Sequence, residues 1–450
     1  MTLQLSPFDF TYARSSAGVS LSHPLLFKPR QVIWLVGASG SGKSTFLHLL
    51  KGFYPEFLSG RITGNEPAVF KHAMFMAQNP ASQIVHERVG EEFFFTLENN
   101  QDAVEKMHHT RHWLAQFGLS EHEFSPTSQL SHGLAQRLLL ASQLAAQPEW
   151  LLLDEPTAFL NPKIRDEFYL TLKALKNTVG IVLIDHHPHA ADFADICWYI
   201  DAQGRLSEMS VANYLSLQQD ELNQETQKLN SSWPLNKITP TFTLRGKHLK
   251  IGYKNKPLFS ADFTLSNGEC AVLMGENGTG KSTLFNTLAN MHKPLSGQFE
   301  LTVSGELQKK PSEHMAYVFQ HPDSHFYFDT IAEDLTQFGI SELETTLAQI
   351  GLPDTAHRSP HQLSEGQKRR LTLLYPCLQG KPLILLDEPT FGQDAVNALR
   401  ITRLILDLKQ AGHAIIVITH DVDLQHAIAD YVWTIAAGEL RVSATQATHS

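Results

Sequence analysis

The stretch GASGSGKST at residues 37–45 recurs as GENGTGKST at residues 275–283. Both fit the pattern G-x-x-x-x-G-K-[S/T], in which glycines let backbone N–H groups curl around phosphate oxygens without Cβ clashes. An apolar run precedes each stretch and helical spacing follows it, so each is predicted to join a buried strand to a helix. The N-terminal dipole of that helix points toward the same anion. A chance glycine-rich turn is the alternative, and the repetition in the same setting disfavours it.

The two glycine loops predict two sites for ATP and Mg²⁺. In each loop the lysine is expected to reach the β- and γ-phosphates, and the serine after it to bind Mg²⁺. The predicted nucleotide-binding residues are Gly37, Ser39, Gly40, Gly42, Lys43, Ser44 and Thr45 in the first loop, and Gly275, Asn277, Gly278, Gly280, Lys281, Ser282 and Thr283 in the second.

An acidic pair ends a short apolar run in each half of the chain, Asp154–Glu155 after WLLL and Asp387–Glu388 after LILL. Continuous apolar runs are typical of buried parallel strands, and such sheets bind ligands at the carboxyl ends of their strands. Each aspartate is predicted to hold Mg²⁺, and each glutamate to orient and polarise the attacking water. An exposed turn is the alternative for a lone pair, and the glycine loop upstream argues against it.

The whole set of motifs occurs twice, in the same order. The further pairs are MAQNP (76–80) with VFQHP (318–322), LSHGLAQR (130–137) with LSEGQKRR (363–370), LLLDEPTAFLNP (151–162) with LILLDEPTFGQD (383–394), and IVLIDHH (181–187) with IVITHD (416–421). We therefore expect two α/β domains, 1–215 and 239–450, each with a mostly parallel sheet flanked by helices. The polar stretch 216–238 is predicted to be the linker, with a short helix at its start.

Composition narrows the class of protein. The net charge of −10 gives no strong basic field for nucleic acid, so no nucleic-acid partner is expected. Three isolated cysteines indicate a reducing cytoplasm, and the sequence shows neither a signal peptide nor an apolar stretch of about 20 residues. His186, His187 and His189 form the densest histidine cluster, but their spacing matches no recurring metal-ligand pattern, which favours separate roles over a metal site.

Together the glycine loop, LS-x-G, DEPT and a later histidine resemble the ATPase domain of ATP-binding-cassette (ABC) proteins, twice and over nearly the whole chain. The resemblance implies a helical subdomain and an N-terminal antiparallel β part in each half. It also implies roles for four groups: Q-loop glutamines that bind Mg²⁺, sense water and contact transporter helices (Gln78, Gln320), switch histidines at the γ-phosphate (His186, His420), tyrosines that stack on adenine (Tyr12, Tyr253), and signature residues (Ser131, Gly133, Ser364, Gly366, Gln367). For the tyrosines, a place in the core is the alternative.

In this family two domains pack head to tail, and each ATP lies between one domain's glycine loop and the other's signature. The second half keeps LSEGQ, with Glu365 replacing a glycine, and its D-loop ends in Asp394. The first half departs further, with His132 and Leu134 in the signature and Asn161 at the D-loop.

The crossing of motifs places both first-half departures in the site built on Lys281. We therefore hypothesise that the site built on Lys43 hydrolyses ATP faster. That site has its own departure, because Asp185-His186-His187 replaces the usual Thr-His-Asp. Tolerated drift, with both sites working, is the alternative.

The segments after the Q-loop glutamines suggest what the ATP is for. QNPASQIVHERVGEEFFFTLEN (78–99) and QHPDSHFYFDTIAEDL (320–335) are similar to those of energy-coupling-factor (ECF) and cobalt-type importers, with Gln83 matching a second glutamine and His325 departing from it. The resemblance implies uptake of a vitamin or metal ion, with a transmembrane coupling protein and a substrate-binding membrane protein as partners. The chain is then expected at the cytoplasmic face of the inner (plasma) membrane, as a peripheral subunit.

Two rival functions remain at this point. One is the tandem ATPase of a sugar importer, which the Q-loop segments disfavour. The other is a soluble tandem ABC protein that acts on ribosomes or DNA, which the short and mildly charged linker disfavours.

Overall fold

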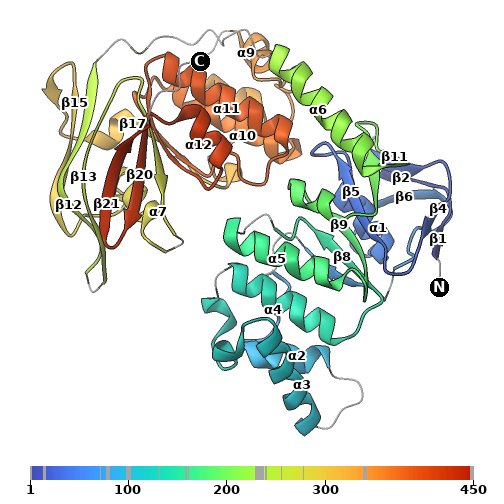
Figure 1. The fold of residues 1–450 in the computed structure, drawn as a ribbon. Coiled ribbons are helices and arrows are strands. Elements are labelled where there is room, and N and C mark those ends of the chain that lie inside the picture. Colours follow the sequence, from blue (N-terminus) through green and yellow to red (C-terminus); the bar gives the residue numbers. More distant parts are fainter. Residues whose placement is uncertain are drawn as a thin grey trace. The chain divides into compact units, whose positions relative to one another are not determined.

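The computed structural model describes residues 3–13, 17–70, 72–77, 82–97, 103–130, 132–157, 160, 162–228, 238, 241–254, 256–276, 278–337 and 342–445. Its contacts divide the chain into two compact units, Met1–Asp220 and Glu221–Ser450 (Figure 1). Each unit combines a largely parallel sheet, an antiparallel β part and a group of helices, which confirms the predicted fold class.

The first unit begins with an antiparallel β part and continues into the parallel sheet. Its strands are β1 (Leu3–Leu5), β2 (Phe8–Tyr12), β3 (Gly18–Leu21), β4 (Leu25–Phe27), β5 (Val32–Gly37), β6 (Gly60–Gly64), β7 (Met74–Met76), β8 (Trp150–Asp154), β9 (Gly180–Ile184), β10 (Ile196–Ile200) and β11 (Arg205–Met209). Its helices are α1 (Lys43–Lys51), α2 (Val89–Thr96), α3 (Ala103–Gln116), α4 (His132–Ala145) and α5 (Pro162–Leu175), with α6 (Val211–Lys228) at its end.

The second unit repeats this plan with longer antiparallel strands. Its strands are β12 (Phe242–Tyr253), β13 (Lys256–Ser266), β14 (Cys270–Met274), β15 (Ser296–Val303), β16 (Glu306–Leu307), β17 (Met315–Val318), β18 (Leu383–Asp387), β19 (Ala414–Ile418), β20 (Tyr431–Ala436) and β21 (Glu439–Ala444). Its helices are α7 (Lys281–Leu288), α8 (Ile331–Thr336), α9 (Leu343–Gln349), α10 (Glu365–Leu378), α11 (Ala395–Gln410) and α12 (Val422–Ile428).

The parallel part has the same strand order in both units. It runs β7-β8-β9-β5-β10 in the first and β17-β18-β19-β14-β20 in the second. The strand before the glycine loop, β5 or β14, therefore lies next to the strand that precedes the predicted switch histidine, and the strand that ends in the aspartate of the acidic pair lies one place further. This order brings motifs that are far apart in sequence to one edge of each sheet.

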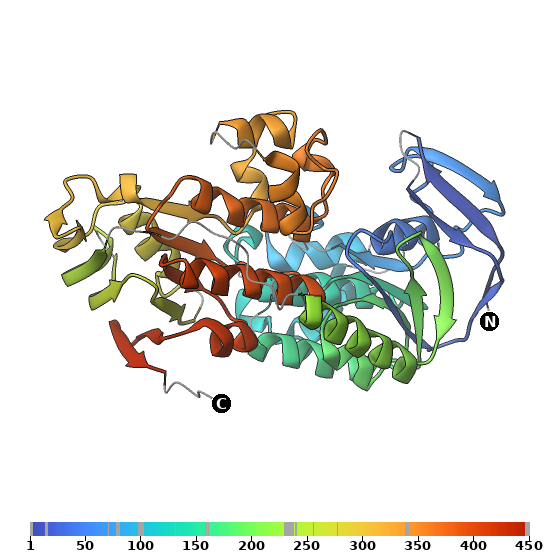
Figure 2. The ribbon, with the colours of Figure 1, turned by 90° about the horizontal axis from the view of Figure 1, so that it is seen from above.

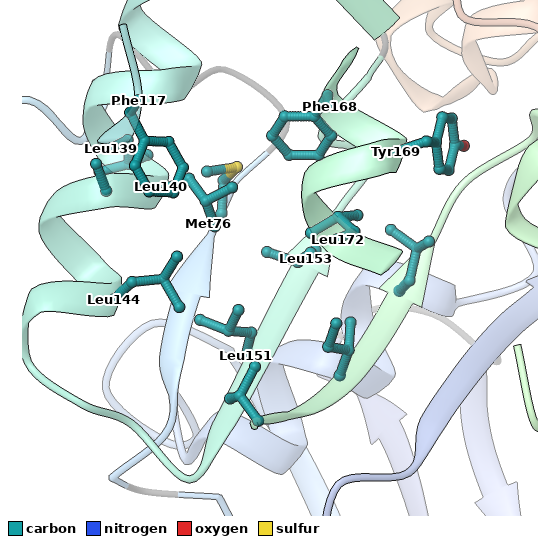
Figure 3. Close-up of a cluster of buried hydrophobic side chains, with 14 of the residues drawn as sticks. Met76, Phe117, Leu139, Leu140, Leu144, Leu151, Leu153, Phe168, Tyr169 and Leu172 are labelled. Carbon is teal, nitrogen blue, oxygen red and sulfur yellow. The ribbon is translucent and has the colours of Figure 1, made fainter. Parts of the chain in front are cut away.

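Alternation along the central strands builds a core on each face of the sheet. In β5, Val32, Trp34 and Val36 face the core that includes α4 and α5, whereas Ile33 and Leu35 face the core that includes α1. Figure 3 shows the first of these cores, where leucines and aromatic side chains of α4 and α5 converge on β7 and β8. Burial of each such side chain contributes about 1.5–3 kcal/mol.

A helical part stands away from the sheet in each unit. In the second unit it comprises α8, α9 and the start of α10, coloured orange in Figure 2. Thr330 opens α8 with a reciprocal capping box, since its hydroxyl accepts the Glu333 N–H while the Glu333 carboxylate accepts the Thr330 N–H. These helices carry the signature motif at the start of α10.

The predicted linker starts with a longer helix than its polar sequence indicated. Helix α6 extends through Lys228, and the division between the units falls inside it. No glycine or proline interrupts its run of Leu, Gln and Glu residues, which favour helix. In the second unit the helix is held to α11 by an ion pair, with 2.7 Å between Arg400 Nε and Glu225 Oε1. The domain bounds 1–215 and 239–450 stay predictions.

Candidate functional site

The glycine loops end where their helices begin. Gly42 and Gly280 immediately precede α1 and α7 with φ angles of 103° and 106°, which are strained for a residue with a Cβ. A Cβ on Gly42 would lie 2.6 Å from a Val19 methyl carbon, so space as well as backbone conformation requires glycine there. Among the remaining predicted loop glycines, Gly37 ends β5 and Gly40 lies between β5 and α1, while Gly275 and Gly278 lie between β14 and α7. Asn277 lies outside the described residues.

The loop lysines are buried and bond to the loop itself. Lys43 Nζ donates to the carbonyls of Gly37 (2.8 Å) and Ala38 (3.0 Å), and Lys281 Nζ to those of Gly275 (2.6 Å) and Glu276 (3.1 Å). Burial lowers the pKa of Lys281, opposed by the nearby carboxylates. Each unit therefore holds a cation inside its glycine loop, where an anionic ligand would have an oppositely charged partner.

The oxygen ligands expected for Mg²⁺ meet in the first unit. Ser44 Oγ donates to Asp154 Oδ1 at 3.1 Å, although the two residues are far apart in sequence. Burial and the neighbouring Glu155 raise the pKa of Asp154 to about 6, so the buried carboxylate lacks a full counter-charge. A hydroxyl beside such a carboxylate is the donor set that Mg²⁺ takes, and the residues present fit the ion.

The second unit differs in this contact. The hydroxyl group of Tyr317 donates a hydrogen bond to Asp387 Oδ2 at 3.3 Å. Ser282 is exposed on the first turn of α7. Burial raises the pKa of Asp387, while the Tyr317 hydrogen bond and Lys281 lower it. Sequence reasoning missed Tyr317, because a tyrosine on a sheet strand gives no signal of its partner on the next strand.

The glutamates after the aspartates have a strained backbone. Glu155 and Glu388 have φ angles of 46° and 50°, in the left-handed region that residues with a Cβ avoid. Each donates its N–H to the last carbonyl of the adjacent strand, Ile184 (2.9 Å) or Ile418 (2.8 Å). Strain of this kind persists only where the surroundings fix it, and it clusters at functional sites.

Each glutamate faces the predicted switch histidine. The distance from His186 Nε2 to Glu155 Oε1 is 3.3 Å, and that from His420 Nε2 to Glu388 Oε1 is 3.7 Å. Burial, and next the charge of Asp387, raise the pKa of Glu388 to about 7. A carboxylate with such a pKa can accept a proton near neutral pH.

The second signature caps its helix. Ser364 Oγ accepts the Gln367 N–H at 3.3 Å, and Gln367 Oε1 accepts the Ser364 N–H at 2.9 Å. A Cβ on Gly366 would lie 2.7 Å from both Asn397 Cγ and Gln393 Oε1, so only glycine allows the close approach to the D-loop and α11. In the first signature, Gly133 lies in the first turn of α4, and Ser131 lies outside the described residues, as does Asn161.

The signature helices also hold the strained segment after the acidic pair. Arg369 Nη1 donates to the Glu388 carbonyl at 2.8 Å, and Gln136 Nε2 donates to the Pro156 carbonyl. Both residues lie five positions after the signature serine in their own half. That shared offset is the signal that could have identified them.

The two predicted adenine-stacking tyrosines differ in their contacts and in their exposure. The Tyr12 hydroxyl is 2.6 Å from Thr45 Oγ1, beside the predicted phosphate-binding residues. Tyr253 is 54% exposed, and its ring centroid lies 5.1 Å from that of His292. The exposed ring of Tyr253 is available to stack on a base, whereas the hydroxyl of Tyr12 already contacts Thr45.

The Q-loop segments share one contact despite their different sequences. Gln83 Oε1 accepts the Ala77 N–H at 2.6 Å, and His325 Nε2 accepts the Phe319 N–H at 3.0 Å. Ala77 and Phe319 directly precede the predicted Q-loop glutamines. Gln320 is half-buried, and Gln78 lies outside the described residues.

The histidine cluster of the first unit has contacts within itself and with two aspartates. His187 and His189 lie side by side with ring centroids 4.6 Å apart, and His189 contacts Asp166 (3.4 Å) and Asp192 (3.3 Å). Across the described ranges, no group of three or more His, Cys, Asp or Glu side chains could hold a metal ion.

Two glycine loops, each with a buried lysine and a facing Asp–Glu pair, define a nucleotide-hydrolysing protein of the P-loop class with a duplicated site. The ABC transporter family matches the chain over residues 23–158 and 258–391, which together are more than half of it, and the chain belongs to this family. It is therefore an ATPase. ABC ATPases bind ATP, generally together with Mg²⁺, and in transporters they work with transmembrane components.

Similar proteins span nearly the same length. A Bacillus subtilis (strain 168) protein, provisionally named as the HMP/thiamine import ATP-binding protein YkoD, is 28% identical over 96% of this chain and 89% of its own length. An ABC transporter ATP-binding protein of Methanosarcina mazei, also provisionally named, is 27% identical over 97% of this chain and 94% of its own length.

A solved structure of similar fold is the archaeal ribosome recycling factor aABCE1, in complex with the ribosomal stalk protein aP1. It has a TM-score of 0.64 and 18% identity, over 96% of this chain and 88% of that chain. At this identity the likeness shows the fold. In the part of the chain that the structure describes, no helix is both long and apolar enough to cross a membrane.

Proposed function

We propose that the chain is the ATP-hydrolysing subunit of an importer of the ECF or cobalt type, which takes up a vitamin or metal ion through membrane partners. The observation that carries this proposal is a pair of exposed apolar segments, one after each Q-loop, described below as docking segments: residues 84–86 in the first unit and 326–328 in the second. The import name of the Bacillus subtilis relative supports it.

The docking segments present apolar side chains outward. Val85 is 68% exposed in the first unit, and Tyr327 is 82% and Phe328 42% exposed in the second. Adjacent exposed aromatic side chains such as Tyr327 and Phe328 are costly in water, and a partner that covers them would remove this cost. The proposed partner is the transmembrane coupling protein, whose cytoplasmic helices would pack on both segments.

Buried carboxylates hold these segments in place. Glu92 Oε2 accepts the N–H groups of Val85 (3.1 Å) and His86 (2.9 Å), and Asp334 Oδ1 accepts that of Tyr327 (3.2 Å). Both carboxylates are 4% exposed. Since they lie on α2 and α8, the helical part of each unit fixes the shape of the surface that the partner would meet.

In the proposed chemistry, ATP binds with its phosphates in the glycine loop, against Lys43 or Lys281. Mg²⁺ would be held by Ser44 and Asp154, or by Ser282 and Asp387, and would neutralise charge on the phosphates. Gln78 and Gln320 would complete the metal site and sense the water molecule that attacks the γ-phosphate. Glu155 or Glu388 would accept a proton from that water while the water oxygen attacks the γ-phosphorus. The bond between the γ-phosphorus and the bridging oxygen breaks, and ADP leaves. His186 or His420 donates a hydrogen bond to the γ-phosphate.

As in the rest of the family, we propose that the two sites are composite. Ser364, Gly366 and Gln367 would then serve the site built on Lys43, and Ser131 and Gly133 the site built on Lys281. Tyr12 and Tyr253 would stack on adenine. The crossed departures in sequence support a faster site at Lys43.

Purification of the tagged full-length chain from its own cells in mild detergent tests the importer proposal. The expected result is recovery of two membrane proteins, one that couples and one that binds substrate. Recovery of ribosomal proteins without membrane proteins would overturn it. A Tyr327→Ser/Phe328→Ser variant should lose the membrane partners, whereas Leu307→Ser, which changes a side chain that is 61% exposed on β16, should keep them.

A further inference from the structure

The segments that follow β9 and β19 differ in sequence but correspond in space. Glu155 donates its N–H to the Ile184 carbonyl and Glu388 to that of Ile418, so the residues after the two isoleucines are equivalent. Asp185-His186-His187 in the first unit therefore corresponds to Thr419-His420-Asp421 in the second. The acidic residue precedes the histidine in one unit and follows it in the other.

In the second unit two side chains share two tasks. Asp421 Oδ2 accepts the hydroxyl of Thr390 at 2.8 Å, and Thr390 belongs to the DEPT motif. Thr419 Oγ1 accepts the N–H of Asp421 at 3.0 Å, which holds the backbone around His420. One contact thus ties the histidine loop to the loop of Glu388, and the other shapes the histidine loop itself.

In the first unit Asp185 alone performs both tasks. Its Oδ2 accepts the hydroxyl of Thr157, the DEPT threonine, at 2.6 Å, and its Oδ1 accepts the N–H of His187 at 3.0 Å. The side chain is 7% exposed, and its backbone carbonyl accepts the indole N–H of Trp34 at 2.9 Å. A buried carboxylate with both oxygens occupied is fixed in orientation.

The remaining contact of Asp421 is a helix cap, and in the first unit His187 makes the corresponding contact. Asp421 Oδ1 accepts the Leu424 N–H at 3.0 Å and so caps α12. His187 Nδ1 accepts the N–H of His189 at 3.3 Å, at the start of the short helix Pro188–Asp192. Burial is the main cause that lowers the pKa of His187 to about 4, so the ring is neutral and able to accept.

The hydrogen bond between Thr157 and Asp185, here called the tether, connects the parts of the chain that carry the facing side chains Glu155 and His186. Thr157 is two residues after Glu155, and Asp185 directly precedes His186, so the Thr157–Asp185 bond joins the loops that carry both side chains. We propose that Asp185 is a positioning residue for the Glu155–His186 pair in ATP hydrolysis, and that it combines the contacts of Thr419 and Asp421. It acts through Thr157 and the backbone of its own loop. The inference rests on ATPase activity, whatever the chain's partners are.

Transposition of the acidic residue tests this inference. Asp185→Thr should lower kcat of the full-length chain, with KM for ATP changed less than threefold, because the pair loses its alignment while the glycine loop remains. The loss of kcat in the Glu155→Gln variant is the reference with which this loss is compared. The double variant Asp185→Thr/His187→Asp rebuilds the arrangement of the second unit and should recover most of that loss. Thr157→Val, which replaces the hydroxyl with a methyl group of similar size, should resemble Asp185→Thr.

The second unit provides the matched control. Asp421→His should lower kcat, and Thr419→Asp/Asp421→His should recover it. The urea midpoint of the nucleotide-free protein is measured for every variant. If kcat follows that midpoint across the series, or if the double variants recover nothing, Asp185 is a structural residue and the inference is wrong. A Glu155→Gln variant with full turnover would also overturn it, since no catalytic pair would then exist to be held.

Discussion

At the scale of single residues, the aspartates that end β8 and β18 have different partners. Tyr317 lies beside Leu385 on the edge strand, and Phe75 takes the same place beside Leu152. Only the second unit therefore has a phenol that reaches its aspartate, Asp387, at 3.3 Å.

Removal of that phenol should destabilise the protein. We expect Tyr317→Phe to lower the free energy of unfolding by about 1 kcal/mol, because the half-buried carboxylate of Asp387 loses a donor. Urea denaturation without nucleotide measures it. Tyr431→Phe is the control, since Tyr431 donates to Glu269 over a similar 3.2 Å on a more exposed part of the sheet. Its loss should be less than half as large, and equal losses would contradict the prediction.

The raised pKa of Glu388 predicts a pH-dependent effect on stability. Between the unfolded value of 4.5 and the folded value of about 7, the folded chain binds more protons, so the wild type loses stability as pH rises through this window. Glu388→Gln removes the ionising group. Its gain over the wild type should be about 2 kcal/mol larger at pH 8 than at pH 5.5, by urea denaturation. Glu306→Gln, on the exposed strand β16, should track the wild type at both values.

The sequence predicted the residues whose chemistry follows a spacing, such as Lys43 and Glu388, and the structure places them at one edge of each sheet. It did not predict Tyr317 or the Thr157–Asp185 tether. Their partners lie on neighbouring strands or directly after them, and which side chains meet there depends on register and packing, which no local pattern records.

At the scale of elements, the segment after each Q-loop is anchored by one side chain. His325 differs from Gln83 in type, yet each accepts the N–H of the residue before the Q-loop glutamine. Burial lowers the pKa of His325 to about 4, so its ring is neutral and can accept.

An amide can therefore replace this imidazole. His325→Gln should retain the contact, whereas His325→Leu should speed hydrogen exchange of the Phe319 amide by about tenfold, because its acceptor is gone. Exchange measured by mass spectrometry distinguishes the two variants, and Gln83→His serves as the reciprocal control. Equal exchange in all three would show that the side chain at this position does not hold the loop.

Element prediction succeeded where an apolar pattern was continuous, and it underestimated the length of the helix at the start of the polar stretch. The apolar runs before the glycine loops and acidic pairs are β5, β14, β8 and β18. Helix α6 extends to Lys228 because its polar residues also favour helix. Glu225 also forms an ion pair with Arg400 on α11, a contact between distant segments that a local pattern does not indicate.

At the scale of the whole molecule, the two halves carry unequal motifs, so the contribution of each ATP site to turnover can be measured separately by mutation. If the site built on Lys43 is faster, Glu155→Gln should reduce turnover of the assembled complex by at least fivefold more than Glu388→Gln does. Steady-state phosphate release measures both variants. Equal losses would favour two working sites with tolerated substitutions.

The strained backbone of Glu155 and Glu388 has a consequence for how such a chain can be changed. Glycine at either position would relieve the left-handed φ, at a gain of about 1 kcal/mol, and at Glu388 it would also remove a half-buried carboxylate whose pKa is raised by burial. A thermostability screen would therefore reward the loss of both glutamates, and with them the proposed water-activating groups. Activity and stability trade off here at single positions, so directed evolution of this molecule needs a selection for turnover at every round.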